Sequence, residues 1–236
     1  MKRRSVLAGL AAAGLDLEAQ KDSSAPASLY IPKPQRVEDR KLLDDLMDEF
    51  SFADLVTAEP AIRITHIPVL LDRNAGTYGT IYGHLARQNP QTEAIVAGAR
   101  AVIVFHGPHS YISPTWYAKT EAVPTWNFAA VHAGGKLKAV AGEAALRDFL
   151  GKLVRKYEGP GSPYDLAELP QSFLSGLIAG ILGFKLEIEL LEGKFKLGQE
   201  RIEGDKEGIL KHLRTTPPEP SLYDLTASFY ARQTNQ

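Results

Sequence analysis

Hydrophobic positions recur with helical spacing in several segments of the chain. Between Glu38 and Phe50, the apolar residue Leu46 lies three or four positions after Leu43 and Leu42, among charged residues. This spacing predicts an amphipathic helix, because such positions share one helix face. The same kind of pattern predicts further helices over Glu143–Tyr157, Leu169–Leu182 and Gly204–Leu213, a weaker one over Leu222–Tyr230, and a short helix or turn over Gln91–Ala97.

Other segments alternate apolar and polar residues or are rich in β-branched residues, which is typical of strands. The pairs Gly134-Gly135 and Glu192-Gly193 interrupt two of these segments and predict hairpin turns. Helices and strands do not alternate regularly, so we expect an α+β protein built on an antiparallel barrel. The predicted strands cover Phe52–Ala58, Ala61–Leu71, Tyr78–Leu85, Arg100–His106, Thr125–Ala133, Lys136–Val140, Phe184–Leu191 and Lys194–Gln199.

The first 28 residues have the pattern of an export signal. Arg3-Arg4 precedes the apolar run Val6–Leu15, and Ala25-Pro26-Ala27 offers a small-x-small cleavage site. We therefore expect a twin-arginine-type leader and a periplasmic protein; the alternative is a disordered or amphipathic leader on a cytoplasmic protein. The apolar run is too short to span a bilayer, so no membrane span is expected in the mature protein. The chain is therefore expected to consist of a leader over 1–28, a domain with helical additions over 29–215 and a C-terminal tail over 216–236.

Composition excludes several functional classes. The 236 residues carry a net charge of −1 and no cysteine. The near-neutral charge argues against nucleic acid as a partner, and the lack of cysteine removes thiolate metal sites and cysteine nucleophiles. The spacing of His106 and His109 suits a metal, but a proline lies between them and no carboxylate is nearby in the sequence, so we expect no metal site. Catalytic residues cannot be assigned from any known nucleophile motif.

Aromatic residues concentrate between Phe105 and His132. Both tryptophans of the chain, Trp116 and Trp126, fall in this stretch and alternate with small hydrogen-bonding residues. Flat apolar faces beside polar groups suit a planar ligand with a polar edge. The alternative, an aromatic hairpin packed into a barrel core, fits the spacing equally well.

Several ordered motifs resemble the PaiB family, which belongs to the FMN-binding split-barrel superfamily and is labelled as negative transcriptional regulators. The resemblance implies a six-stranded split barrel and a homodimer with flavin mononucleotide (FMN) at the interface. It extends over about residues 29–213. The motifs that carry it are Tyr30–Pro32, Thr65–Pro68, Gly83–Pro90, Phe105–Tyr117, Val123–His132 and Leu191–Gln199.

Within these motifs, ten residues are candidate FMN ligands. A phosphate needs cations and hydroxyl donors, for which Arg87 is the first candidate, Lys196 the second, and Ser113 or Thr115 the hydroxyls. The flavin ring system needs apolar faces and polar groups at its edge. Those candidates are Trp116, Trp126, Asn127 and Gln199, and the remaining two, His84 and Asn89, belong to the Gly83–Pro90 motif.

Each candidate also has a structural interpretation, such as core packing for Trp126 or a solvated strand face for Lys196. The sequence departs from the family at Gly198 and Glu200, where serine and asparagine are usual. The added negative charge and the missing hydroxyl disfavour a phosphate at those two positions.

Three functions remain open at this point. An FMN-binding, flavin-linked oxidoreductase-like protein is the first, and a PaiB-type transcriptional regulator is the second. The third is haem binding, for which the available histidines are His66, His84, His106, His109 and His132. The absence of a helix-turn-helix candidate and the export signal both argue against the regulator.

Overall fold

The computed structural model describes residues 28–118, 121–215 and 220–233. They form an antiparallel sheet of eight strands together with peripheral helices, which confirms the α+β class. Six strands are long, which is the number that the family resemblance implied, and two are short. The long strands are β2 (Phe52–Thr57), β3 (Arg63–Pro68), β5 (Thr80–Ala86), β6 (Arg100–Ile112), β7 (Thr125–Ala139) and β8 (Ile181–Lys196), and the short ones are β1 (Arg36–Val37) and β4 (Leu70–Asp72).

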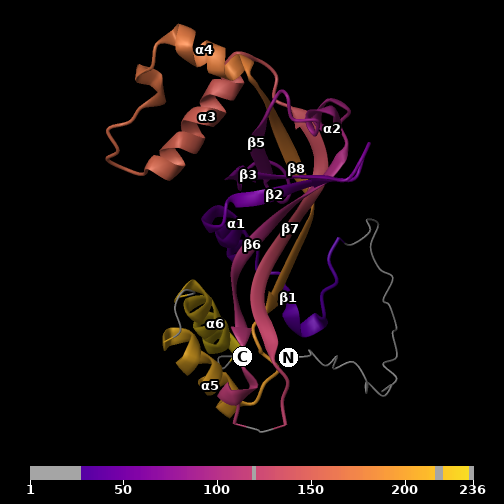
Figure 1. Cartoon of the computed structure of the whole chain (residues 1–236), viewed down its shortest axis with the longest axis vertical. Coiled ribbons are helices and arrows are strands. Elements are labelled where there is room, and N and C mark those ends of the chain that lie inside the picture. The colour runs from indigo at the N-terminus through magenta and orange to yellow at the C-terminus, as the bar shows by residue number, and fades with distance from the viewer. Residues whose placement is uncertain (1–27, 119–120, 216–219, 234–236) are drawn as a thin grey trace, which may run out of the picture.

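The strands are ordered β3-β2-β6-β7-β8-β5-β4 in the sheet, with β1 added to the far end of β8. Strands β7 and β8 run most of the length of the molecule (Figure 1). Helices α3 (Glu143–Glu158) and α4 (Gln171–Ala179) lie at one end of this pair. Helices α5 (Glu203–Thr215) and α6 (Pro220–Gln233) lie at the other end.

The two predicted hairpin turns are wrong. Gly134-Gly135 and Glu192-Gly193 both lie inside single continuous strands, β7 and β8. The pairing shifts register at the first site, because Gly134 pairs with Leu190 while Gly135 pairs with Ile188. One residue of β8 is therefore extra at this point, which is the signature of a β-bulge and bends the strand pair.

Close packing explains the glycines. A Cβ atom at Gly135 would lie 2.2 Å from the carbonyl oxygen of Glu187 on the neighbouring strand. A Cβ atom at Gly193 would lie 2.3 Å from the side chain of Leu43 in α1 (Arg40–Glu49). The glycines thus allow backbone and helix to approach the strands where a side chain would collide.

Helix α1 closes the inside of the sheet with the face that the sequence predicted. Its residues Leu43, Leu46 and Met47 are buried in the main core, and the side chain of Asp39 caps its first turn by accepting from the Leu42 amide. The core also contains the inward side chains of the long strands, among them Phe105 and Phe195. The remaining helices are α2 (Thr92–Val96) and the 3₁₀ turns η1 (Lys33–Gln35), η2 (Pro114–Trp116) and η3 (Leu166–Glu168).

A second, smaller core lies under α3 and α4. It is formed by Leu146, Phe149, Leu153, Leu174 and Ile178, and Tyr82 of β5 packs against it. The helical pair is thus attached to the outer side of β4 and β5 by apolar contacts of its own.

The C-terminal residues form a helix that packs on the barrel. In α6, Thr226 and Tyr230 are buried, and the Tyr230 hydroxyl donates to the carbonyl oxygen of Leu197 just after β8. Gly198 follows in a left-handed conformation (φ 76°) with the Tyr230 hydroxyl 3.2 Å from the position of a Cβ atom. Serine, which the family usually has at this position, would be strained here.

The predicted leader lies outside the described residues except for Ser28. No helix within residues 28–118, 121–215 and 220–233 has both the length and the apolar character needed to cross a bilayer. The division into leader, domain and tail stays a prediction.

The bulge gives a testable expectation for Gly135→Ala. The new methyl group would collide with the Glu187 carbonyl, so the free energy of unfolding should fall by about 1–3 kcal/mol. Denaturant titration of the purified variant measures this. Gly176→Ala is the matched control, since Gly176 lies in α4 with open space around it, and should be neutral or stabilising by about 1 kcal/mol. Equal stability of the two variants would contradict the packing role of Gly135.

Candidate functional site

The register of the sheet places many chemically active side chains on one surface. Directly paired residues of antiparallel strands point to the same side, and so do alternate residues of one strand. His106 pairs with Ala130 and Ala130 with Lys194; His109 pairs with Phe128 and Phe128 with Lys196. We call this surface the open face; it consists of Asp54, His66, His106, His109, Tyr111, Trp126, Phe128, His132, Glu192, Lys194 and Lys196.

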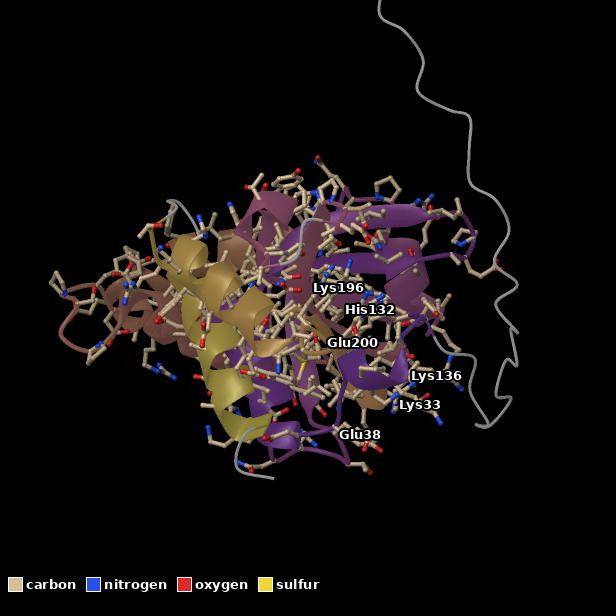
Figure 2. All side chains as sticks on the ribbon, turned by 90° about the horizontal axis from the view of Figure 1, so that it is seen from below. Lys33, Glu38, His132, Lys136, Lys196 and Glu200 are labelled. Carbon is tan, nitrogen blue, oxygen red and sulfur yellow. The ribbon has the colours of Figure 1, made fainter. Side chains whose placement is uncertain are left out.

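Two lysines give one end of the open face a positive charge. Lys196 Nζ donates to Thr125 Oγ1 at 2.5 Å, and Lys194 Nζ lies 5.6 Å from the ring centre of Phe128. Burial, together with the charge of Lys196, lowers the pKa of Lys194. Figure 2, which looks along the molecule from below Figure 1, shows Lys196 with His132 to the right of α5 and α6. Neither ammonium pairs with a carboxylate of the described chain, so both have donors available for an anion.

Trp126 and Asn127 point to opposite sides of β7. Trp126 is 54% exposed on the open face, next to the rings of His109 and Tyr111. Asn127 is buried on the inner side, and its Nδ2 has no hydrogen-bond partner. Burying an unpaired amide costs free energy, so the Asn127 side chain has an unused donor that an acceptor would satisfy.

The turn after β6 holds three further candidates. The hydroxyls of Ser113 and Thr115 are 2.8 Å apart, and Ser113 caps the 3₁₀ turn η2. Trp116 stacks on His212 of α5, with 4.9 Å between ring centres and an angle of 4° between the planes. One face of Trp116 is therefore already covered within the chain.

The side-chain amide of Gln199 is hydrogen-bonded to backbone groups of its own chain. Its Oε1 accepts from the Leu197 amide at 2.8 Å, and its Nε2 donates to the carbonyl oxygens of Pro34 and Phe195 at 2.8 and 2.6 Å. These bonds fix the end of β8 to the turn η1.

His84 and Arg87 lie at the other end of the sheet. The His84 ring packs edge-on against Phe149 of α3, its Nδ1 is buried without a partner, and burial lowers its pKa. Arg87 Nε donates to the carbonyl oxygen of Ala179 at 2.8 Å. Among the residues that the structure describes, no carboxylate pairs with the Arg87 guanidinium, so its terminal nitrogens can serve an anion.

Asn89 belongs to a polar network beside this end. Its Nδ2 donates to Thr65 Oγ1 at 3.0 Å and its Oδ1 accepts from the Gln91 amide at 2.9 Å. Gln91 is fully buried and bonds in turn to β2 and β3. The network joins α2 to the edge of the sheet.

The ten candidates therefore form two groups that do not meet in one chain. His84, Arg87 and Asn89 lie at one end of the sheet, and the other end has Ser113, Thr115, Trp116, Trp126, Asn127, Lys196 and Gln199. His84 pairs with Gly183 near the start of β8, whereas Lys196 is at its end. The path along β8 between these points is about 40 Å at about 3.3 Å per residue. A single mononucleotide cannot reach both groups within one protomer.

A cluster that sequence reasoning missed lies in the middle of the open face. Asp54 of β2 binds two imidazoles, His66 through Nδ1 and His106 through Nε2, the latter at 2.9 Å. Burial alone would raise the pKa of Asp54, but the hydrogen bonds from His106 and His66 outweigh it and lower this pKa. The sequence pattern predicted that both histidines lie on strands. Only the pairing between the strands shows that the two imidazoles share one carboxylate.

A cavity on the outer side of the sheet is separate from the candidates. It measures about 580 Å³, lies between α3 and strands β4 and β5, and has Leu70, Tyr82 and Phe149 in its wall. None of the ten candidates lines it, although Arg87 lines a cavity of about 300 Å³ under α4. Among residues 28–118, 121–215 and 220–233, no group of three or more His, Asp or Glu side chains could hold a metal ion.

Comparison with known proteins shows a family. Residues 29–190 match the family model described as "Putative FMN-binding domain". The Bacillus subtilis protein named protease synthase and sporulation protein PAI 2 is 35% identical over 188 residues, which cover 79% of this chain and 89% of that protein.

Solved structures agree on the fold. The FAD and heme binding protein of Mycobacterium smegmatis has a TM-score of 0.52 and 20% identity over 69% of this chain and 73% of that one. The flavocytochrome Anf3 of Azotobacter vinelandii has a TM-score of 0.54 and 15% identity over 70% and 72%. The predicted α+β split barrel is confirmed.

The Asp54 cluster predicts a pH-dependent stability. Because the folded-state pKa of Asp54 is below its ordinary value of 3.8, its ionised form stabilises the fold above that value. This contribution is lost as the pH falls through the folded-state pKa. Chemical denaturation of the wild type and Asp54→Asn between pH 3 and 6 should therefore show a stability difference that shrinks towards pH 3. Parallel curves would rule out the pairing of Asp54 with the two imidazoles.

Proposed function

The chain belongs to this family of FMN-binding domains, and on that premise we propose that it is a flavin-linked oxidoreductase that binds FMN in two sites of a homodimer, each site built from both protomers. FMN is the cofactor of the family, and it supplies the transfer of one or two electrons when bound. The residues of this chain bind and orient it.

The described side chains fit the chemistry of FMN. A phosphate requires N–H donors that are not neutralised, and Lys194, Lys196 and Arg87 provide them. The flavin ring system requires an apolar face with polar groups at its edge; Trp126 provides the face on the open side of β7, whereas the unpaired amide of Asn127 lies on the inner side and does not reach the same ring. The departures at Gly198 and Glu200 do not remove any of these groups.

The separation of the two groups along β8 carries the proposal of shared sites. If a twofold axis passes through the open face, Arg87 of one protomer can approach Lys196 of the other, because the two chains then run past each other in opposite directions. The open face has the apolar side chains that such an interface needs. Tyr111 and Trp126 are 45 and 54% exposed in the single chain.

Binding of FMN is expected to depend on Lys196. A charge-assisted hydrogen bond to phosphate contributes about 1.5–3 kcal/mol, so Lys196→Ala should weaken FMN binding by about 10- to 100-fold. Quenching of flavin fluorescence on titration measures the dissociation constant. Lys41→Ala removes the same charge from a side chain of α1 that is 81% exposed and should leave binding unchanged. A wild-type protein that neither carries a yellow chromophore nor binds added FMN would overturn the function, and a Soret band on haem titration would favour haem instead.

Shared sites can be tested by complementation. Arg87→Ala and Lys196→Ala should each bind FMN weakly as separate homodimers. When the two variants are unfolded, mixed and refolded, a mixed dimer should regain one intact site, because the remaining Arg87 and Lys196 come from different chains. Flavin stoichiometry and sedimentation measure this, with each variant refolded alone as the control. A monomer in solution, or no recovery in a mixed dimer, would argue against sites built from both protomers.

A further inference from the structure

A buried carboxylate on the open face lacks a cationic partner. Glu192 of β8 is only 5% exposed. Its Oε2 accepts two hydrogen bonds from Ser28, one from the backbone nitrogen at 2.9 Å and one from Oγ at 2.6 Å. Within residues 28–118, 121–215 and 220–233, no lysine or arginine nitrogen lies within 4.0 Å of the Glu192 carboxylate. Ser28 is thus the main partner of this buried carboxylate.

The neighbouring histidine does not neutralise this charge. His132 pairs with Glu192 across the strands, and its Nδ1 is 3.0 Å from Ser28 Oγ (Figure 2 labels His132). Burial has the largest effect and lowers the pKa of His132; the charge of Glu192 raises it, and His106 adds a smaller lowering. The lowered pKa favours the neutral imidazole; because the Ser28 hydroxyl proton goes to Glu192, the tautomer protonated at Nδ1 would donate to Ser28 Oγ.

Hydrogen bonds from neutral groups offset only part of the free energy that burying a carboxylate costs. Removing an ionised group from water is costly unless an opposite charge lies close to it. A positive charge on the Ser28 nitrogen would be 2.9 Å from Glu192 Oε2, which is the distance of a charge-assisted hydrogen bond. The backbone nitrogen of a residue carries such a charge only when that residue is the first of its chain.

The sequence immediately before Ser28 offers a way to produce that charge. Ala25-Pro26-Ala27 is a small-x-small site that follows a twin-arginine pair and an apolar run. We propose that a signal peptidase cleaves the exported chain between Ala27 and Ser28, and that the new α-ammonium group of Ser28 forms an ion pair with Glu192. Water adds across the Ala27–Ser28 peptide bond, so Ala27 leaves with a carboxylate and Ser28 keeps the amine, which takes up a proton.

This ion pair would fix the start of the mature chain on the open face. Two residues further on, the carbonyl oxygen of Tyr30 accepts from Lys194 Nζ at 2.9 Å, and the Tyr30 ring lies 5.4 Å from the same ammonium. Residues 28–30 are thus held at both ends by β8, through Glu192 and through Lys194. The inference depends on neither FMN nor dimerisation.

The site of processing can be read from the mass of the exported protein. The full chain is expressed in a bacterium with a twin-arginine translocase, and the protein in the periplasmic fraction is analysed by intact mass spectrometry. The expected mass is that of a chain beginning at Ser28. As a control, Arg3→Lys combined with Arg4→Lys should keep the protein in the cytoplasm and uncleaved. A mature chain that begins at another residue, or an uncleaved exported chain, overturns the proposal.

The ion pair is tested separately on proteins of defined N-terminus. A chain beginning at Ser28 is compared with one that retains Ala27 and with one acetylated at Ser28, which keeps the contacts but has no charge. At pH 6 the Ser28 chain should unfold about 2–4 °C higher than either. Pairing raises the folded-state pKa of the ammonium above its ordinary value of about 8. The advantage is therefore complete at pH 6 and is lost as the pH rises through the folded-state value.

The carboxylate is the other half of this test. In Glu192→Gln the three chains should unfold at the same temperature, because the ammonium has no anion to pair with. Should this variant fail to fold, the acetylated chain with Glu192 intact still decides the matter. Equal unfolding temperatures of the free and acetylated Ser28 chains at pH 6 overturn the ion pair.

Discussion

The close approach of β7 and β8 at Gly135 is the constraint on which the rest of the structure depends. The backbone of β8 comes so near that no side chain fits at Gly135, and the bulge beside it bends both strands. Two long strands can then curl around α1 without a break. Gly193 allows Leu43 of α1 to pack directly on the same pair. The helical additions attach to the two ends of this strand pair, which is why the molecule is elongated.

Because the strands are long, the candidate ligands are far apart. Arg87 lies near the α4 end and Lys196 near the α5 end, and β8 connects them as a nearly extended path. Under the proposed function, each end of one chain contributes part of an FMN site, and a second copy in antiparallel orientation is the simplest arrangement that joins the parts.

Charged groups on the open face are mostly arranged around carboxylates. Asp54 binds two imidazoles and Glu192 binds Ser28, while the lysines at the end of β8 keep unpaired donors. The acidic groups are thus committed to the fold, whereas the basic groups remain available to an anionic ligand. The departure from the family at Gly198 has a structural reason as well, since the left-handed turn there makes room for Tyr230 of α6.

The sequence by itself determined the local elements and the family. Apolar spacing located α1, and alternation located most strands, because these patterns depend only on which face is buried. It could not show that Gly134-Gly135 and Gly193 lie within strands, since a glycine that avoids a collision looks the same as one that makes a turn. It also could not bring Asp54, His66 and His106 together, or show which of Trp126 and Asn127 faces the core. Those relations arise from the register between strands distant in sequence, which only the tertiary structure decided.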